Sequence, residues 1–227
     1  MINIDFLTLK AFYKENIDFI IGSRLQKIQQ PTRRDFVFWL RNINESRKLY
    51  ININPQIYHI AFMNKENEQR RSIEIPKKPP MFCMLLRKHL EGCRITDVNI
   101  VENERIIEFY FETYNEISEK RELCLCVELM GKHSNIILYD KTTSVIIGCA
   151  HNIGAEKSKF RELKGGLRYV CPPKVNTLTK ISNPLYKFLK KDDNFATVNE
   201  LLDNYFSKIQ AETILKTKKE ELKKKIN

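Results

Sequence analysis

The sequence predicts an α+β fold: a mainly antiparallel sheet with flanking helices, followed by C-terminal helices. Apolar residues recur at every second position in many short segments, and turn residues separate these segments. After Pro173 the pattern changes, and helical spacing replaces the alternation. We therefore expect a sheet domain over residues 1–174 and a helical extension over residues 175–227.

The first domain is expected to open with a helix over residues 5–14. Phe6, Leu9 and Phe12 share its apolar face, and Asp5 stands at the favoured N-cap position. Residues 64–78 are polar and charged without regular apolar spacing, which predicts a loop. A double proline at 79–80 then presets the first turn of a second, short helix.

Eight segments have the composition of strands. In the second of them, Phe36, Phe38 and Leu40 alternate with Val37 and Trp39. The segments are residues 24–29, 35–41, 49–53, 94–101, 105–112, 122–130, 135–139 and 144–149.

Turn and helix signals complete the order of elements. Residues 140–143, DKTT, form the clearest hairpin connection. Residues 183–191 predict a weak helix, and residues 198–226 predict a stronger one that is similar to the start of a coiled coil.

The chain is strongly basic, with a formal net charge of +11. Without the six lysines between positions 216 and 225, the remainder still carries about +5. Such an excess favours binding to a polyanion through counterion release. The alternative interpretation of the charge is a solvated, lysine-rich surface.

Several classes of protein are disfavoured. No apolar run reaches about 18 residues, and the first ten residues lack the features of a signal peptide, so we expect a cytoplasmic protein without a membrane span. The six cysteines form no CxxC pair and are expected to be buried and reduced, with Cys124 and Cys126 on one strand face. The histidines lack the spacing of metal ligands, and the nucleotide-binding and hydrolase motifs are missing. We therefore expect no metal, no cofactor and no enzymatic activity.

Cationic and polar residues gather at four places that suit contact with RNA. Arg87, Lys88 and His89 end the short helix, where at most two of them share the exposed face. Glu104 and Arg105 open a strand and point to opposite faces, with Arg105 on the side of Ile107. The structural alternative for the cationic end of the helix is an interaction with the helix dipole. The structural alternative for Glu104 and Arg105 is a solvated ion pair.

The other two places lie further along the chain. The motif that begins at Glu128 presents four candidate RNA-backbone contacts on a tight connection between strands. An ordinary hairpin turn is the alternative. Arg161 belongs to a further polar pair, before a glycine turn. The four candidates are Lys132, His133, Ser134 and Asn135.

Five motifs, in this order, together resemble the N-terminal domain of the NFACT family, once called fibronectin-binding protein A. The resemblance covers roughly residues 1–174 and implies a fold similar to the N-terminal part of formamidopyrimidine-DNA glycosylases. The motifs are GSRLQKIQQP (22–31), PPMFCMLLRKHLEG (79–92), NERIIEFYF (103–111), ELMGKHSNIIL (128–138) and RELKGGLRYVCPP (161–173).

The resemblance implies a ribosome quality-control factor that binds tRNA and rRNA. Such factors bind a large ribosomal subunit that carries peptidyl-tRNA, and they recruit charged tRNA, alanyl-tRNA in bacteria, for C-terminal tailing. Because the ribosome makes the peptide bond, the factor itself is a binding protein. The tRNA-contacting Asp-Arg pair of the family matches Glu104 and Arg105, and its acidic positions match Glu128 and Asp5.

The chain also departs from the family pattern. The family usually continues into a helix-hairpin-helix domain, a long coiled coil and a further domain. Here the segment resembling the coiled-coil entry follows Pro173 after only about twenty residues. We therefore expect the helix-hairpin-helix region to be shortened or absent, in either an abbreviated protein or a fragment.

Two other functions are weighed against RNA binding. A surface adhesin that binds fibronectin or fibrinogen is suggested by the old family name, but unpaired cysteines fit secretion poorly. A glycosylase would require a proline nucleophile after the initiator methionine and then a glutamate, where this chain has Ile2 and Asn3. Glycosylase chemistry is therefore rejected.

Overall fold

The computed structural model describes residues 4–114, 117, 119–156, 158–173, 185–189 and 195–226. Ile2, Asn3 and part of the expected helix at 183–191 lie outside these residues. The helices are α1 (Phe6–Ile20), α2 (Lys65–Arg71), α3 (Met81–Leu90), the 3₁₀ turn η1 (Gly131–His133), α4 (Leu185–Leu189) and α5 (Val198–Ile226). The strands are β1 (Arg24–Gln29), β2 (Asp35–Asn42), β3 (Glu45–Asn52), β4 (His59–Met63), β5 (Ile95–Ile100), β6 (Ile106–Tyr114), β7 (Lys120–Glu128), β8 (Asn135–Asp140) and β9 (Ile146–Cys149).

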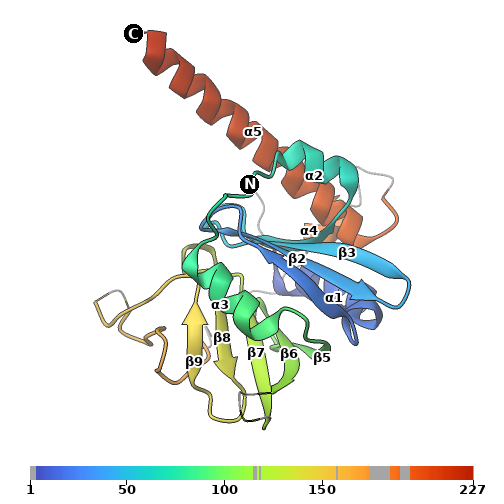
Figure 1. Cartoon of the computed structure of the whole chain (residues 1–227). Coiled ribbons are helices and arrows are strands. Elements are labelled where there is room, and N and C mark those ends of the chain that lie inside the picture. The colour runs from blue at the N-terminus through green and yellow to red at the C-terminus, as the bar shows by residue number, and fades with distance from the viewer. Residues whose placement is uncertain are drawn as a thin grey trace.

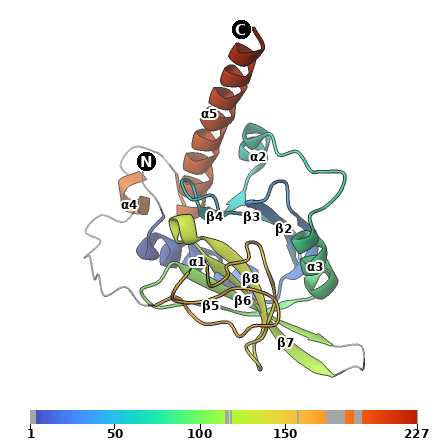
Figure 2. The ribbon, with the colours of Figure 1, turned by 90° about the vertical axis from the view of Figure 1, so that its left-hand side faces the viewer.

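The strands form two antiparallel sheets, each ordered as in the sequence. Sheet A contains β1 to β4, and sheet B contains β5 to β9. The sheets lie one above the other in Figure 1, with α3 on one side of the molecule and α1 on the other in Figure 2. Helices α2 and α5 lie against sheet A on the side away from sheet B. This arrangement confirms the predicted α+β class.

A single apolar core joins these layers. Phe36, Phe38 and Leu40 of β2 belong to it, as the alternation predicted, together with Leu9 and Phe12 of α1. Inward residues of α3, α5 and both sheets complete the cluster. Because the core includes residues from both sheets, the loops at the edges of sheets A and B are held in fixed positions relative to one another.

Helix α2 corrects the loop predicted for residues 64–78. Asn64 caps it by accepting a hydrogen bond from the backbone N–H of Asn67, and Ser72 ends it in the left-handed region with a φ of 48°. Its buried residues are Asn67 and Arg71, which are polar. A helix that buries polar residues shows no apolar periodicity, and this is why the sequence pattern missed it.

Other boundaries differ in extent. Helix α1 continues to Ile20, six residues beyond the predicted end, and β3 begins at Glu45 rather than at 49. Strand β4 was not predicted, because all but one of its five residues are buried and no alternation remains to be seen. The predicted N-cap is confirmed, since Asp5 Oδ1 accepts a hydrogen bond of 2.8 Å from the Thr8 backbone.

Helix α5 matches the prediction for 198–226, but its first half is part of the folded body. Leu201, Leu202 and Phe206 are buried in the core, while the second half projects away from both sheets in Figures 1 and 2. The domain boundary expected after residue 174 stays a prediction.

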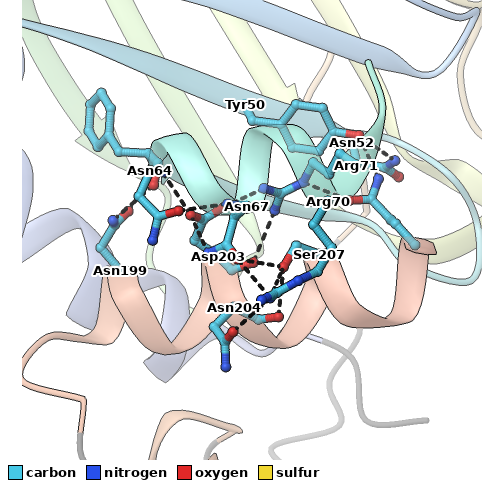
Figure 3. Close-up of polar contacts among 12 residues, drawn as sticks. Tyr50, Asn52, Asn64, Asn67, Arg70, Arg71, Asn199, Asp203, Asn204 and Ser207 are labelled. Atoms are coloured by element: carbon cyan, nitrogen blue, oxygen red, sulfur yellow. Dashed lines mark hydrogen bonds and ion pairs between the residues drawn. The ribbon is translucent and has the colours of Figure 1, made fainter. Parts of the chain in front are cut away.

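A polar network fastens α5 to α2 (Figure 3). Arg71 and Asp203 form an ion pair of 2.5 Å in which both side chains are 1% exposed. Asp203 also accepts hydrogen bonds from the Asn64 backbone and the Asn67 side chain. Gln210 accepts a hydrogen bond from Arg71 Nε and donates one to the Tyr50 hydroxyl. The network satisfies the charges that this interface buries.

The second face of sheet B has its own smaller core. Cys124 and Cys126 share this face, as predicted, and the segment that contains Leu163 and Tyr169 covers them. The cysteines of the described residues are free thiols, but the expectation of burial is wrong for Cys171, which is exposed. Cys171 lies beyond the segment that closes this face, so its apolar sequence context was misleading.

His59 of β4 is fully buried, and its pKa lies well below the usual 6.5, because of burial first and the charge of Arg71 second. Its Nδ1 lies 2.6 Å from the Ile57 carbonyl oxygen, its ring stacks on Phe206 with centroids 4.0 Å apart, and Nε2 has no hydrogen-bond partner among the described residues.

We expect the free energy of unfolding to fall as the pH is lowered below 6.5. The unfolded state binds a proton on His59 there and the folded state does not, so the loss reaches up to about 1.4 kcal/mol per pH unit. Urea unfolding at several pH values between 7 and 5 measures it. His59→Phe keeps the stacked ring without the proton site, and its profile should be flatter than that of wild type. Equal slopes would contradict the assignment.

Candidate nucleic-acid interface

Arg105 lies at the edge where the two sheets meet. It precedes β6 on the sheet face of Ile107, as the alternation predicted, and its guanidinium lies over the Tyr58 ring, 5.7 Å from the centroid. Burial raises the pKa of Tyr58, the charge of Arg105 lowers it and the charge of Asp5 raises it. The charges of Arg105 and Asp5 therefore both act on the Tyr58 hydroxyl.

The η1 turn joins the same edge. A Cβ atom added at Gly131 would lie 3.7 Å from Tyr58 Cε1 and 3.8 Å from the Pro55 carbonyl oxygen, so the turn lies against the loop between β3 and β4. Lys132 and His133 are exposed on this turn. The fold therefore brings together two of the predicted groups, which are separated by more than twenty residues in the sequence. We call Asp5, Tyr58, Arg105, Lys132 and His133 the Arg105 surface.

Tyr58 is the member that the sequence analysis missed. It is only 3% exposed and lies in a loop, where neither strand nor helix periodicity marks it. An aromatic ring beneath an arginine restricts the guanidinium to one plane and favours its contact with a phosphate or a base edge.

Asp5 belongs to this surface and also stabilises α1 and α4 by accepting hydrogen bonds from their backbones. Its Oδ1 caps α1, and its Oδ2 accepts a hydrogen bond of 2.7 Å from the backbone N–H of Leu185 in α4. Both carboxylate oxygens are therefore engaged, and the side chain supplies negative charge near Tyr58 rather than a free acceptor.

Glu104 lies away from Arg105, on the opposite sheet face. Its charge raises the pKa of Cys171, after the larger effects of burial, Glu128 and Arg161. Both residues lie in the bend just before β6, and no ion pair joins Glu104 to Arg105 among the described residues. The shape of this edge therefore depends more on Arg105 than on the length of the acidic side chain.

Glu128 does not present a free carboxylate for RNA. It is 0% exposed, and Arg161 binds both of its oxygens, with Nη1 2.7 Å from Oε1. The Tyr169 hydroxyl donates a further hydrogen bond of 2.9 Å. Direct RNA contacts were expected for Glu128 and Arg161, and their burial corrects this expectation. The pair instead holds the segment that contains Leu163 and Tyr169 against sheet B.

Ser134 and Asn135 are also buried, which corrects their expected contact with an RNA backbone. Ser134 Oγ accepts a hydrogen bond of 2.9 Å from the Met130 backbone. The Asn135 side chain donates to the His151 carbonyl oxygen and accepts from the His151 N–H, at 2.8 and 3.0 Å. These residues hold the η1 turn in shape, and Lys132 and His133 remain as its exposed members.

The cationic end of α3 lies at the other end of sheet B. Arg87 Nε donates a hydrogen bond to the Ile28 carbonyl oxygen, so Arg87 ties α3 to β1 and is not a free cation. Burial lowers the pKa of His89, followed by the charges of Lys88 and Arg121. Arg121 lies seven residues before Glu128 on β7, about 23 Å along the strand. The structure therefore separates Arg87, Lys88 and His89 from the Arg105 surface.

Other kinds of site have no support in the described part of the chain. No group of three His, Cys, Asp or Glu side chains there is placed to hold a metal ion. Among the helices that the structure describes, none has the length and apolar character needed to cross a bilayer.

The fold and this edge define an N-terminal NFACT domain. The model of the NFACT N-terminal and middle domains matches residues 5–185, and the chain belongs to the NFACT family.

Curated relatives are similar over most of the chain. Rqc2 homolog RqcH of Bacillus subtilis is 35% identical over 164 residues, which are 71% of this chain and 27% of that protein. Rqc2 homolog RqcH of Streptococcus pneumoniae serotype 2 is 33% identical over 159 residues, 70% of this chain and 28% of the relative. The chain thus spans about a quarter of the length of these relatives.

Solved structures confirm the fold. The N-terminal domain of the fibronectin-binding protein PavA from Streptococcus pneumoniae superposes with a TM-score of 0.70 and 27% identity, covering 98% of this chain and 83% of that one. The N-terminal part of the fibronectin/fibrinogen-binding protein from Streptococcus suis also has a TM-score of 0.70, with 31% identity, over 82% of this chain and 67% of its own.

Proposed function

We propose that this chain is the tRNA- and large-ribosomal-subunit-binding domain of a ribosome-associated quality-control factor. Its partners are charged tRNA, alanyl-tRNA in bacteria, and a large subunit that carries peptidyl-tRNA. The domain binds rather than catalyses, and it works in the cytoplasm. The names of the RqcH relatives support the role in quality control.

The observation that carries the RNA-binding part is the Arg105 surface. It combines a guanidinium held over an aromatic ring with two exposed basic side chains, Lys132 and His133, on a turn against the same ring. Ribose-phosphate backbones are bound by such side chains, and exposed bases stack on arginine planes. The net charge of +11 adds attraction over a longer range.

We expect Arg105→Ala to weaken tRNA binding by about 1–3 kcal/mol, because it removes the guanidinium that reaches the RNA from this edge. Filter binding of labelled, unfractionated tRNA at fixed salt measures the loss. Urea unfolding of the same sample should show a folded protein.

Lys88→Ala is the matched control. It removes one positive charge, as Arg105→Ala does, but from an exposed position on α3. We expect wild-type affinity for Lys88→Ala. If Arg105→Ala and Lys88→Ala bind tRNA equally well, the RNA site does not lie at Arg105.

The alternative is a surface adhesin, named after the fibronectin- and fibrinogen-binding neighbours. Titration of the whole chain against immobilised fibronectin and against tRNA separates the two. Binding to fibronectin without binding to tRNA would replace the proposed function.

A further inference from the structure

Two exposed arginines stand in the loop between β1 and β2. Neither Arg33 nor Arg34 has a hydrogen bond or ion pair from its side chain within the described residues. The nearby Asp35 carboxylate forms no ion pair with either arginine in the described part of the chain; its Oδ1 accepts from Tyr50 and Asn52. Both guanidinium groups are therefore free to bind an anion.

The loop that carries these arginines is well ordered by its own bonds. The Thr32 hydroxyl donates to Asp35 Oδ2 and accepts from the Arg34 N–H at 3.1 Å. The Arg34 carbonyl oxygen accepts from the Ile53 N–H at 2.8 Å, which ties the loop to the end of β3. An anion bound here would meet a preformed loop, so little conformational entropy would be lost on binding.

His151 connects this loop to sheet B. The charges of Arg34 and Arg33 contribute to lowering the pKa of His151, after the larger effect of burial. The backbone of His151 is held on both sides by the Asn135 side chain, directly after the η1 turn. His151, which follows β9, therefore lies within electrostatic range of the two arginines.

This cluster continues the Arg105 surface. Ile53, bonded to Arg34, leads into the loop whose Pro55 and Tyr58 pack against Gly131. The loop between β3 and β4 therefore contacts Arg105 and the η1 turn, and the chain that enters it is bonded to Arg34. Several cations on one surface can bind successive phosphates of a polyanion, whereas a single cation provides one contact point.

We infer that Arg33, Arg34 and His151 form a second phosphate-binding site, which holds the backbone of the same RNA that Arg105 contacts. The inference rests on the proposed function and adds a second anchor to it. Guanidinium groups pair with phosphate oxygens in a planar, two-pronged geometry, and no acidic side chain of the described residues is paired with them here.

The test is the salt dependence of tRNA binding by the whole chain. The double variant Arg33→Ala/Arg34→Ala should reduce the slope of log affinity against log salt by about 1.5, since each phosphate contact contributes roughly 0.7–0.9. Affinity at about 100 mM salt should fall on the order of tenfold. The variant Lys218→Ala/Lys219→Ala removes the same charge from exposed positions on the projecting half of α5 and should leave the slope within about 0.3 of wild type.

A second readout follows His151 itself by NMR in the wild-type chain. A phosphate bound by Arg33 and Arg34 brings negative charge close to His151, so the pKa of His151 should rise when tRNA binds. No change in that pKa would overturn the site, as would equal slopes for the arginine and lysine double variants.

The outcomes separate this inference from the proposed function. If wild type does not bind tRNA, the proposed function fails and the second site fails with it. If Arg105→Ala is weakened while Arg33→Ala/Arg34→Ala behaves as wild type, the function stands and the second site is wrong. Loss in both variants with a reduced slope supports both.

Discussion

Asp203→Ala is expected to destabilise the protein by about 3–5 kcal/mol, because it leaves the Arg71 charge buried without its partner. Both side chains of the pair are 1% exposed, and Asp203 also accepts from Asn64 and Asn67. This loss is a third or more of the stability of many domains. Urea unfolding followed by circular dichroism measures it.

The control for this change is Glu66→Gln, which breaks an ion pair on α2 at the surface. Glu66 is 76% exposed, and its pair with Arg70 should contribute no more than about 1 kcal/mol. In the double variant Arg71→Met/Asp203→Leu no charge is left buried, so it should be more stable than Asp203→Ala. A cost below about 1 kcal/mol for Asp203→Ala would show that α5 is held mainly by its apolar residues.

Glu128→Ala should cost a similar 3–5 kcal/mol, because Arg161 would lose both hydrogen bonds to a carboxylate that is 0% exposed. The variant also removes the acceptor of the Tyr169 hydroxyl. Thermal and urea unfolding measure the loss. Glu122→Ala on the same strand is the control, since Glu122 is 48% exposed and pairs with Lys141 at the surface.

Glu128→Ala also shows whether Glu128 only stabilises the fold or binds the RNA directly. If Glu128 only positions the covering segment, the affinity of the folded variant for tRNA should fall less than that of Arg105→Ala. A large loss of affinity with unchanged stability would restore Glu128 as a direct RNA contact.

The elements that were predicted well carry their signals locally. β1 and α5 have the predicted bounds, and Asp5 caps α1 as expected, because periodicity and capping depend on neighbouring residues. Arg105 also lies on the side of the core that contains Ile107 and Tyr58, as the alternation predicted. These properties belong to the chain before any tertiary contact forms.

The errors concern residues whose partners are distant in sequence. Helix α2 was missed because Asn67 and Arg71 are buried by partners on α5, more than 130 positions away. Asn135 was expected on the surface because nothing near it in sequence shows that it binds the His151 backbone. A polar side chain looks exposed in a sequence pattern until its buried partner is known.

Local periodicity and motif order were enough to predict the α+β class, most of the strands and the family resemblance. Which charged residues are free depends instead on the folded structure. It buried Glu128 with Arg161, bound Arg87 to the Ile28 carbonyl oxygen of β1, and brought Arg105 over the Tyr58 ring. The reason is physical: the register between distant segments determines whether a charge meets a partner, a ring or solvent, and adjacent residues do not specify that register.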